Sequence, residues 1–126
     1  MQFSSLRLAD VVVAMPAGQI DHPNAERLEQ ALAPILDATA VRCSALVLDF
    51  SRVEYISSMG LRILLMAAKK LRARNARIAV AALQPVVSEI FGIARFNHVL
   101  EVFPDVRAAL EQLSQEALAA YDATAT

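Results

Sequence analysis

The chain has 126 residues, of which 56% are hydrophobic and 20% are charged, and this composition suits one folded domain and argues against disorder. The 12 Lys and Arg residues nearly balance the 13 Asp and Glu residues, so the net charge gives no pull toward nucleic acid or an acidic membrane surface. Cys43 is the only cysteine, which excludes an internal disulfide and a cysteine-cluster metal site, and we expect its thiol to pack in the core.

The N-terminal residues lack the charged start and apolar run of a secretory signal. No apolar run approaches the ~20 residues that a membrane-spanning helix needs. A lone thiol is typical of a reducing compartment. These features together predict a cytoplasmic protein that does not insert into a membrane.

The first twenty residues predict a strand pair. Residues 11–15 form a continuous apolar, β-branched run and are followed by Pro16 and Gly18, which is typical of a buried strand that ends in a loop. Residues 3–8 have a weaker pattern. We expect them to form an edge strand that pairs with residues 11–15 through a turn at Ala9 and Asp10.

A helix is predicted next, because apolar residues recur at helical spacing from Ala25 to Leu36. Asp21 or Asn24 can cap its start. Pro34 interrupts the pattern, and a proline inside a helix costs ~3 kcal/mol. We therefore expect this helix to kink or end near Ala33.

The rest of the chain alternates between short apolar runs and helical stripes. This alternation implies an α/β protein whose sheet is mainly parallel, with helices as crossover connections. We expect strands at 45–50, 78–83 and 99–103, and helices at about 61–75, 85–91 and 105–121.

No catalytic constellation is complete in the sequence. His22 and His98 lie far apart, and neither belongs to a metal-binding spacing. Ser58 precedes Gly60 as in the GxSxG turn of hydrolases, but Ile56 occupies the position of the first glycine. The glycines are also too far apart for a phosphate-binding loop. We therefore expect a protein without catalytic residues, metal or cofactor, which acts by binding another protein.

Ser57 and Ser58 lie where a strand gives way to a helix. Either serine could be a simple helix N-cap, which contributes ~1 kcal/mol. Either could also be a phosphorylation site, because the free N–H groups and positive dipole of a helix N-terminus tolerate a phosphate. The residue pattern alone leaves both interpretations open.

Three segments resemble the STAS domain family of bacterial anti-sigma factor antagonists. The segment 46–62 (LVLDFSRVEYISSMGLR) resembles the family signature, 18–25 (GQIDHPNA) resembles its first loop, and 96–103 (FNHVLEVF) resembles its late strand. Their order and spacing match the family over about 11–113. The resemblance implies a single STAS-like domain over 1–126, with a core at about 11–113 and a C-terminal helix at about 105–121. It also implies a four- to five-stranded mixed sheet with about four helices packed mainly on one side.

The resemblance further implies a mechanism. Such a protein, when unphosphorylated, binds an anti-sigma factor that is also a serine kinase of the ATPase type, and binding frees the sigma factor. The kinase phosphorylates the antagonist at the start of the second helix, and a phosphatase reverses the modification. With the charge balance above, we expect no nucleic-acid partner and no direct membrane insertion. The residues implied to bind the partner are Asp21, His22, Ser57, Ser58, Met59, Gly60 and Arg62.

One departure from the family pattern concerns the phosphate acceptor. Regulated members read DSSG or DSTG, and the acceptor immediately precedes the glycine. Aligned on Gly60, that position is Met59, which has no hydroxyl. Either Ser58 (or, alternatively, Ser57) accepts the phosphoryl group, or the protein is an unswitched STAS adaptor subunit of another signalling or lipid-transport assembly.

Overall fold

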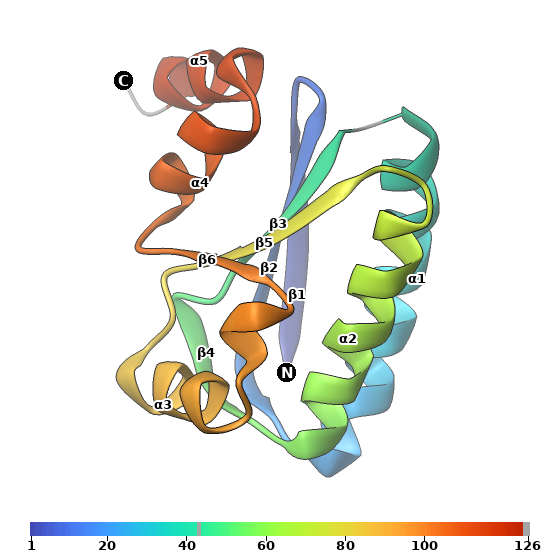
Figure 1. Ribbon diagram of the computed structural model, residues 1–126, viewed down its shortest axis with the longest axis vertical. Coiled ribbons are helices and arrows are strands. Elements are labelled where there is room, and N and C mark those ends of the chain that lie inside the picture. The colour runs from blue at the N-terminus through green and yellow to red at the C-terminus, as the bar shows by residue number, and fades with distance from the viewer. Residues whose placement is uncertain (43, 125–126) are drawn as a thin grey trace.

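The structure is a computed structural model that describes residues 1–42 and 44–124, so the expectation for Cys43 lies outside the described residues. Six strands and five α-helices follow one another in these residues, with a short 3₁₀-helix before the last strand (Figure 1). The strands are β1 (Gln2–Leu8), β2 (Val11–Ile20), β3 (Ala45–Asp49), β4 (Arg52–Ile56), β5 (Arg77–Ala81) and β6 (Glu101–Phe103). The helices are α1 (His22–Arg42), α2 (Ser58–Arg72), α3 (Pro85–Ile93), η1 (Phe96–His98), α4 (Val106–Leu113) and α5 (Gln115–Thr124).

The strands form one mixed sheet in the order β1-β2-β3-β5-β6. The predicted edge strand is confirmed, because β1 pairs antiparallel with β2 across the turn at Ala9 and Asp10. All other pairings are parallel. The long strand β2 changes partner along its length, pairing with β3 at 11–14 and with β4 at 17–20.

The predicted end of the second strand was wrong, because β2 continues through Pro16 and Gly18 to Ile20. Pro16 lies between the part of β2 that pairs with β3 and the part that pairs with β4. Its missing N–H therefore interrupts neither of these parallel pairings. Gly18 has a φ of +100° at the point where the register with β4 shifts, a backbone conformation that favours glycine. Pro16 and Gly18, which predicted a loop, therefore lie where β2 changes its paired strand from β3 to β4.

Alternating side chains of the buried strands supply two separate cores. On one face, Leu46, Leu48 and their neighbours pack against α1, α2 and α3. On the other face, Val47 and its neighbours pack against α4 and α5. The α/β fold with a mixed sheet is confirmed. Helices α1, α2 and α3 contribute to one core, and α4 and α5 contribute to the other. Figure 1 shows α4 and α5 on the opposite side of the sheet from α1 and α2.

The predicted early end of the first helix was wrong. Helix α1 runs from His22 to Arg42 without ending at Pro34, whose side chain points to solvent. Leu32 and Leu36 are buried on either side of this proline. Their burial stabilises the helix by about 1.5–3 kcal/mol each, which offsets the cost of the proline.

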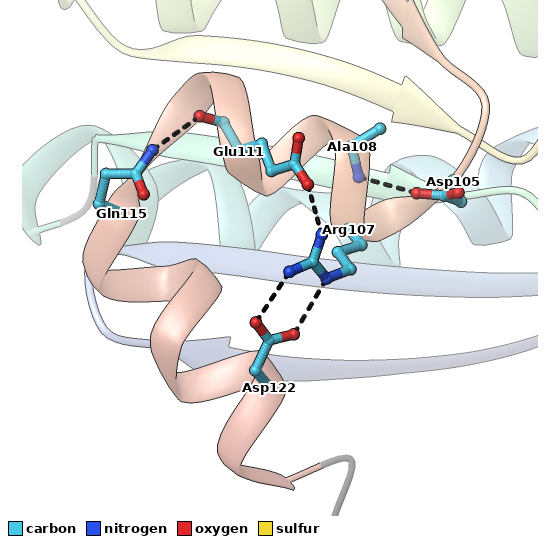
Figure 2. Close-up of polar contacts among 6 residues, drawn as sticks. All are labelled: Asp105, Arg107, Ala108, Glu111, Gln115 and Asp122. Atoms are coloured by element: carbon cyan, nitrogen blue, oxygen red, sulfur yellow. Dashed lines mark hydrogen bonds and ion pairs between the residues drawn. The ribbon is translucent and has the colours of Figure 1, made fainter.

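The predicted C-terminal helix is divided at Ser114, whose extended backbone separates α4 from α5. The Ser114 hydroxyl donates to the Asp10 carboxylate at 2.5 Å and accepts the N–H of Ala117 at 3.1 Å. Arg107 of α4 then joins the two helices, because its guanidinium donates twice to Asp122 of α5 (Figure 2). Together these contacts hold α5 across α4.

Within residues 1–42 and 44–124, none of the helices combines the length and the apolar character needed to cross a membrane.

Candidate functional site at the start of the second helix

The start of α2 is fixed by Ser57. Its backbone is extended, and its Oγ accepts the N–H of Gly60 at 3.2 Å, so Ser57 is the helix N-cap. Ser58 is the first helical residue and is exposed to solvent. Of the two predicted candidates, Ser57 takes the capping role and Ser58 presents its side chain outward.

The start of α1 lies beside this turn. The N–H of Ser57 donates to the carbonyl of Ile20 at 2.8 Å, which joins the end of β4 to the end of β2. The next residue, Asp21, caps α1 by accepting the N–H of Asn24 at 3.1 Å. The predicted cap is therefore Asp21, while the Asn24 side chain donates to the carbonyl of Gln19. The first loop and the Ser57–Ser58 turn, 36 positions apart in the sequence, are adjacent in the structure (Figure 1).

Gly60 explains how closely α2 approaches the sheet. It is buried, and a Cβ built on it would lie 2.8 Å from side-chain atoms of both Ile20 and Ile56. Real Cβ atoms essentially never lie this close to another heavy atom. The glycine lets the first turn of α2 lie on these two strand ends, where a larger residue would clash.

The remaining predicted residues line a hollow between the two helices. His22 begins α1, while Met59 and Arg62 belong to the first turns of α2, and all three line this hollow. Arg62 follows Ser58 by one helical turn, at the i,i+4 spacing that places two side chains on one helix face. The structure thus brings the predicted residues together around the two helix starts.

Other residues of the same hollow were missed by sequence reasoning. They include Pro23, Glu26 and Glu29 of α1 and Ile63 and Met66 of α2. The sequence signal was the recurrence of Met59, Ile63 and Met66 at helical spacing beside the buried stripe of α2.

The loop before β4 is ordered by Asp49. Its carboxylate accepts the N–H of Ser51 at 3.0 Å, and the side chain of Gln84, just before α3, donates to the carbonyl of Ser51 at 2.9 Å. These contacts set the β3–β4 turn and thereby the strand that leads to Ser57. Among the described residues no three His, Cys, Asp or Glu side chains lie close enough together to hold a metal ion.

The chain is similar to known proteins over most of its length. The family model of the STAS domain matches residues 4–109. BtrV, a candidate anti-sigma factor antagonist of Bordetella bronchiseptica, is 36% identical over 104 residues, which cover 82% of this chain and 84% of BtrV.

Solved structures are similar to this chain over most of its length. An anti-sigma factor antagonist from Mycobacterium paratuberculosis is 27% identical, with a TM-score of 0.77 over 89% of this chain and 94% of that chain. A candidate antagonist from Thermotoga maritima shares the fold with a TM-score of 0.79 over 88% of this chain and 93% of that chain, at 18% identity. These relatives are named as regulatory proteins and not as enzymes. The chain therefore belongs to the STAS domain family.

Proposed function

We propose that this protein is a cytoplasmic anti-sigma factor antagonist that binds an anti-sigma serine kinase of the ATPase type and is switched by phosphorylation of Ser58. Its similarity to BtrV and to the mycobacterial antagonist supports the class of function. Binding frees the sigma factor, the kinase phosphorylates the antagonist, and a phosphatase restores it. Neither nucleic acid nor a membrane is a direct partner.

The observation that carries this proposal is the exposure of Ser58 at the first position of α2. The neighbouring Met59 is 39% exposed, and the start of α1 lies beside the same turn. A partner that covers this turn would contact both helix starts, with Asp21, His22, Ser57, Ser58, Met59, Gly60 and Arg62 in or beneath the contact.

Ser58 is a better acceptor than Ser57 for a geometric reason. The hydroxyl oxygen of Ser57 is half-buried and accepts the N–H of Gly60, so a phosphate there would disturb the helix cap. Ser58 is exposed, and its hydroxyl makes no hydrogen bond within the described part of the chain. Modification of Ser58 therefore leaves the cap intact.

A phosphate on Ser58 would act on binding and not on folding. It adds about −1.5 to −2 charges, which the positive end of the α2 dipole accommodates. A partner packed on the same turn would instead have to remove this charge from water. This should cost several kcal/mol, equivalent to a 100-fold or greater loss of affinity.

The test uses the purified protein and an anti-sigma kinase taken from the neighbouring genes. Incubation with ATP followed by mass spectrometry should place phosphate on Ser58, and Ser58→Ala should bind the kinase but resist modification. Ser58→Asp should fold normally and bind at least 100-fold more weakly. Ser5→Asp, on the exposed strand β1, is the charge-matched control and should bind as the wild type does.

A second candidate function follows from Met59. This residue occupies the position that carries the acceptor in regulated members of the family. An unswitched STAS adaptor, a constant subunit of another signalling or lipid-transport assembly, would need no hydroxyl there. Absence of phosphate on any serine, together with tight kinase binding by Ser58→Asp, would favour this adaptor and contradict the switch; phosphate on Ser57 would move the switch by one residue.

A further inference from the structure

Two adjoining hollows form a groove along the helix pair α1 and α2. The two helices lie side by side (Figure 1). The groove begins as a hollow of about 480 Å³ next to the start of α2. A second hollow of about 280 Å³ adjoins it and shares Glu29, Ile63 and Met66 with the first. On α2 the groove reaches from Met59 to Lys70, and we call it the α1–α2 groove.

The floor of the α1–α2 groove carries apolar side chains that are exposed to solvent. Met66 is 54% exposed and Met59 is 39% exposed, with the half-buried Ile63 between them. A partner that covers these adjoining apolar side chains would remove them from water, which favours binding. Methionine suits a docking surface because its unbranched side chain adapts to the shape of what binds.

The rims of the groove carry opposite charges. Glu26 and Glu29 lie on the α1 side, and Arg62 lies on the α2 side. Within the described residues, neither glutamate has an ion pair with Arg62, so these charges remain available to a partner. At the far end, Lys70 donates to Asp37 at 2.7 Å and joins the two helices, and this contact holds the pKa of Asp37 below its ordinary value.

The length of the groove sets the size of its occupant. Lys70 follows Met59 by eleven positions on α2, which at 1.5 Å per residue is roughly 16 Å, or about three helical turns. We propose that the α1–α2 groove binds one amphipathic helix of the partner kinase. Apolar side chains of that helix would cover Met59, Ile63 and Met66, with basic residues toward Glu26 and Glu29 and an acidic residue toward Arg62.

This inference rests on the proposed function and extends it in one respect. Ser58 lies one residue before Met59, at the end of the groove where the docked helix would begin or end. A phosphate on Ser58 would then place its charge at the mouth of an apolar contact. Recognition along the groove and switching at Ser58 are separable, so different variants test them.

The experiment measures the affinity of the purified, neighbour-encoded kinase for matched variants by calorimetry. Met66→Glu places a charge on the groove floor and should weaken binding at least 10-fold. Leu6→Glu makes the same change at a comparably exposed site, 47% exposed on β1, and should leave the affinity unchanged. Glu29→Lys reverses one rim charge and should weaken binding about 3-fold or more, with a larger effect at low salt than at high salt.

The outcomes separate the two proposals. Weaker binding by Ser58→Asp with normal binding by Met66→Glu would overturn the groove and leave the antagonist function standing. Failure of the wild type to bind the kinase would overturn both. If light scattering shows that the wild type is a dimer and Met66→Glu is a monomer, the groove binds a second copy of this chain and the kinase-helix proposal is wrong. An equal loss for Leu6→Glu and Met66→Glu would also overturn it.

Discussion

At the scale of single residues, Gly60 determines how the start of α2 lies on the sheet. The residue is helical, and alanine is favoured over glycine inside a helix by about 1 kcal/mol. Against this, a Cβ at position 60 would lie 2.8 Å from both Ile20 and Ile56, which are fully buried and have little room to move. The cost of the clash that the added Cβ makes should exceed the gain from the higher helix propensity of alanine.

We therefore expect Gly60→Ala to lower the free energy of unfolding by about 1–3 kcal/mol, the usual cost of overpacking a core. The matched control is Gly92→Ala in α3, where a Cβ would meet nothing within 4 Å and the free energy of unfolding should stay the same or rise. Urea denaturation of both variants measures the difference. A Gly60→Ala protein as stable as Gly92→Ala would show that α2 can move away from the strand ends.

At the scale of secondary-structure elements, the sequence predicts most helices and strands but not their limits. Strand β4 was missed because it is short and exposes Arg52, Glu54 and Tyr55, so only Val53 and Ile56 face the core. Its position depends on pairing with the far end of β2, a tertiary contact that local periodicity does not contain. The same pairing brings Ser57 to Ile20. The sequence therefore identified the first loop and the Ser57–Ser58 turn as parts of the site, but it did not predict the hydrogen bond that joins them.

The division of the C-terminal helix has a similar cause. Apolar residues keep helical spacing from Val106 to Tyr121, so the pattern predicts one helix. The break at Ser114 is held by a residue 104 positions away, Asp10 in the β1–β2 turn. No local signal reports a contact of this range. The sequence therefore predicted the apolar face of α4 and α5 but not the change of direction between them.

This break leads to a prediction about α5. Ser114→Ala removes both the donor to Asp10 and the acceptor for the N–H of Ala117, so we expect the free energy of unfolding to fall by about 1–2 kcal/mol. Amide hydrogen exchange of α5 should rise more than that of α2. Gln112→Ala, at an exposed position of α4, should change the free energy of unfolding by no more than about 0.5 kcal/mol and leave the exchange of α5 unchanged. Unchanged exchange in α5 after Ser114→Ala would mean that Arg107 and Asp122 suffice to hold it.

At the scale of the whole molecule, Asp10 joins three segments that lie far apart in the sequence. Its carboxylate accepts the hydroxyl of Ser44, just before β3, at 2.6 Å and the hydroxyl of Ser114, between α4 and α5, at 2.5 Å. Its backbone carbonyl accepts the N–H of Ser44 at 2.8 Å. One carboxylate thus joins the strand pair β1–β2, the central sheet and the C-terminal helices.

These contacts make stability depend on pH in a definite direction. The hydrogen bonds from Ser114 and then from Ser44 favour the ionised carboxylate and lower the pKa of Asp10 below its ordinary value of 3.8. Because the folded pKa is the lower one, the contribution is fully present above the pKa of the unfolded chain and is lost as the pH falls through the folded pKa. The loss should therefore begin near pH 4 and continue below it.

Asp10→Asn tests this linkage, since an amide can still accept a hydrogen bond but does not titrate. We expect the wild type to be more stable than Asp10→Asn at pH 7 and the difference between their denaturation midpoints to shrink as the pH falls below about 4.

Asp37→Asn is the control. The hydrogen bond and the charge of Lys70 also lower the pKa of Asp37, but the side chain of Asp37 is largely exposed to solvent. Salt should weaken the Asp37 effect more than the Asp10 effect, because hydrogen bonds from neutral hydroxyls are not screened as an exposed ion pair is. A difference between wild type and Asp10→Asn that stays constant from pH 7 to pH 3 would show that the carboxylate contributes as a hydrogen-bond acceptor without its charge.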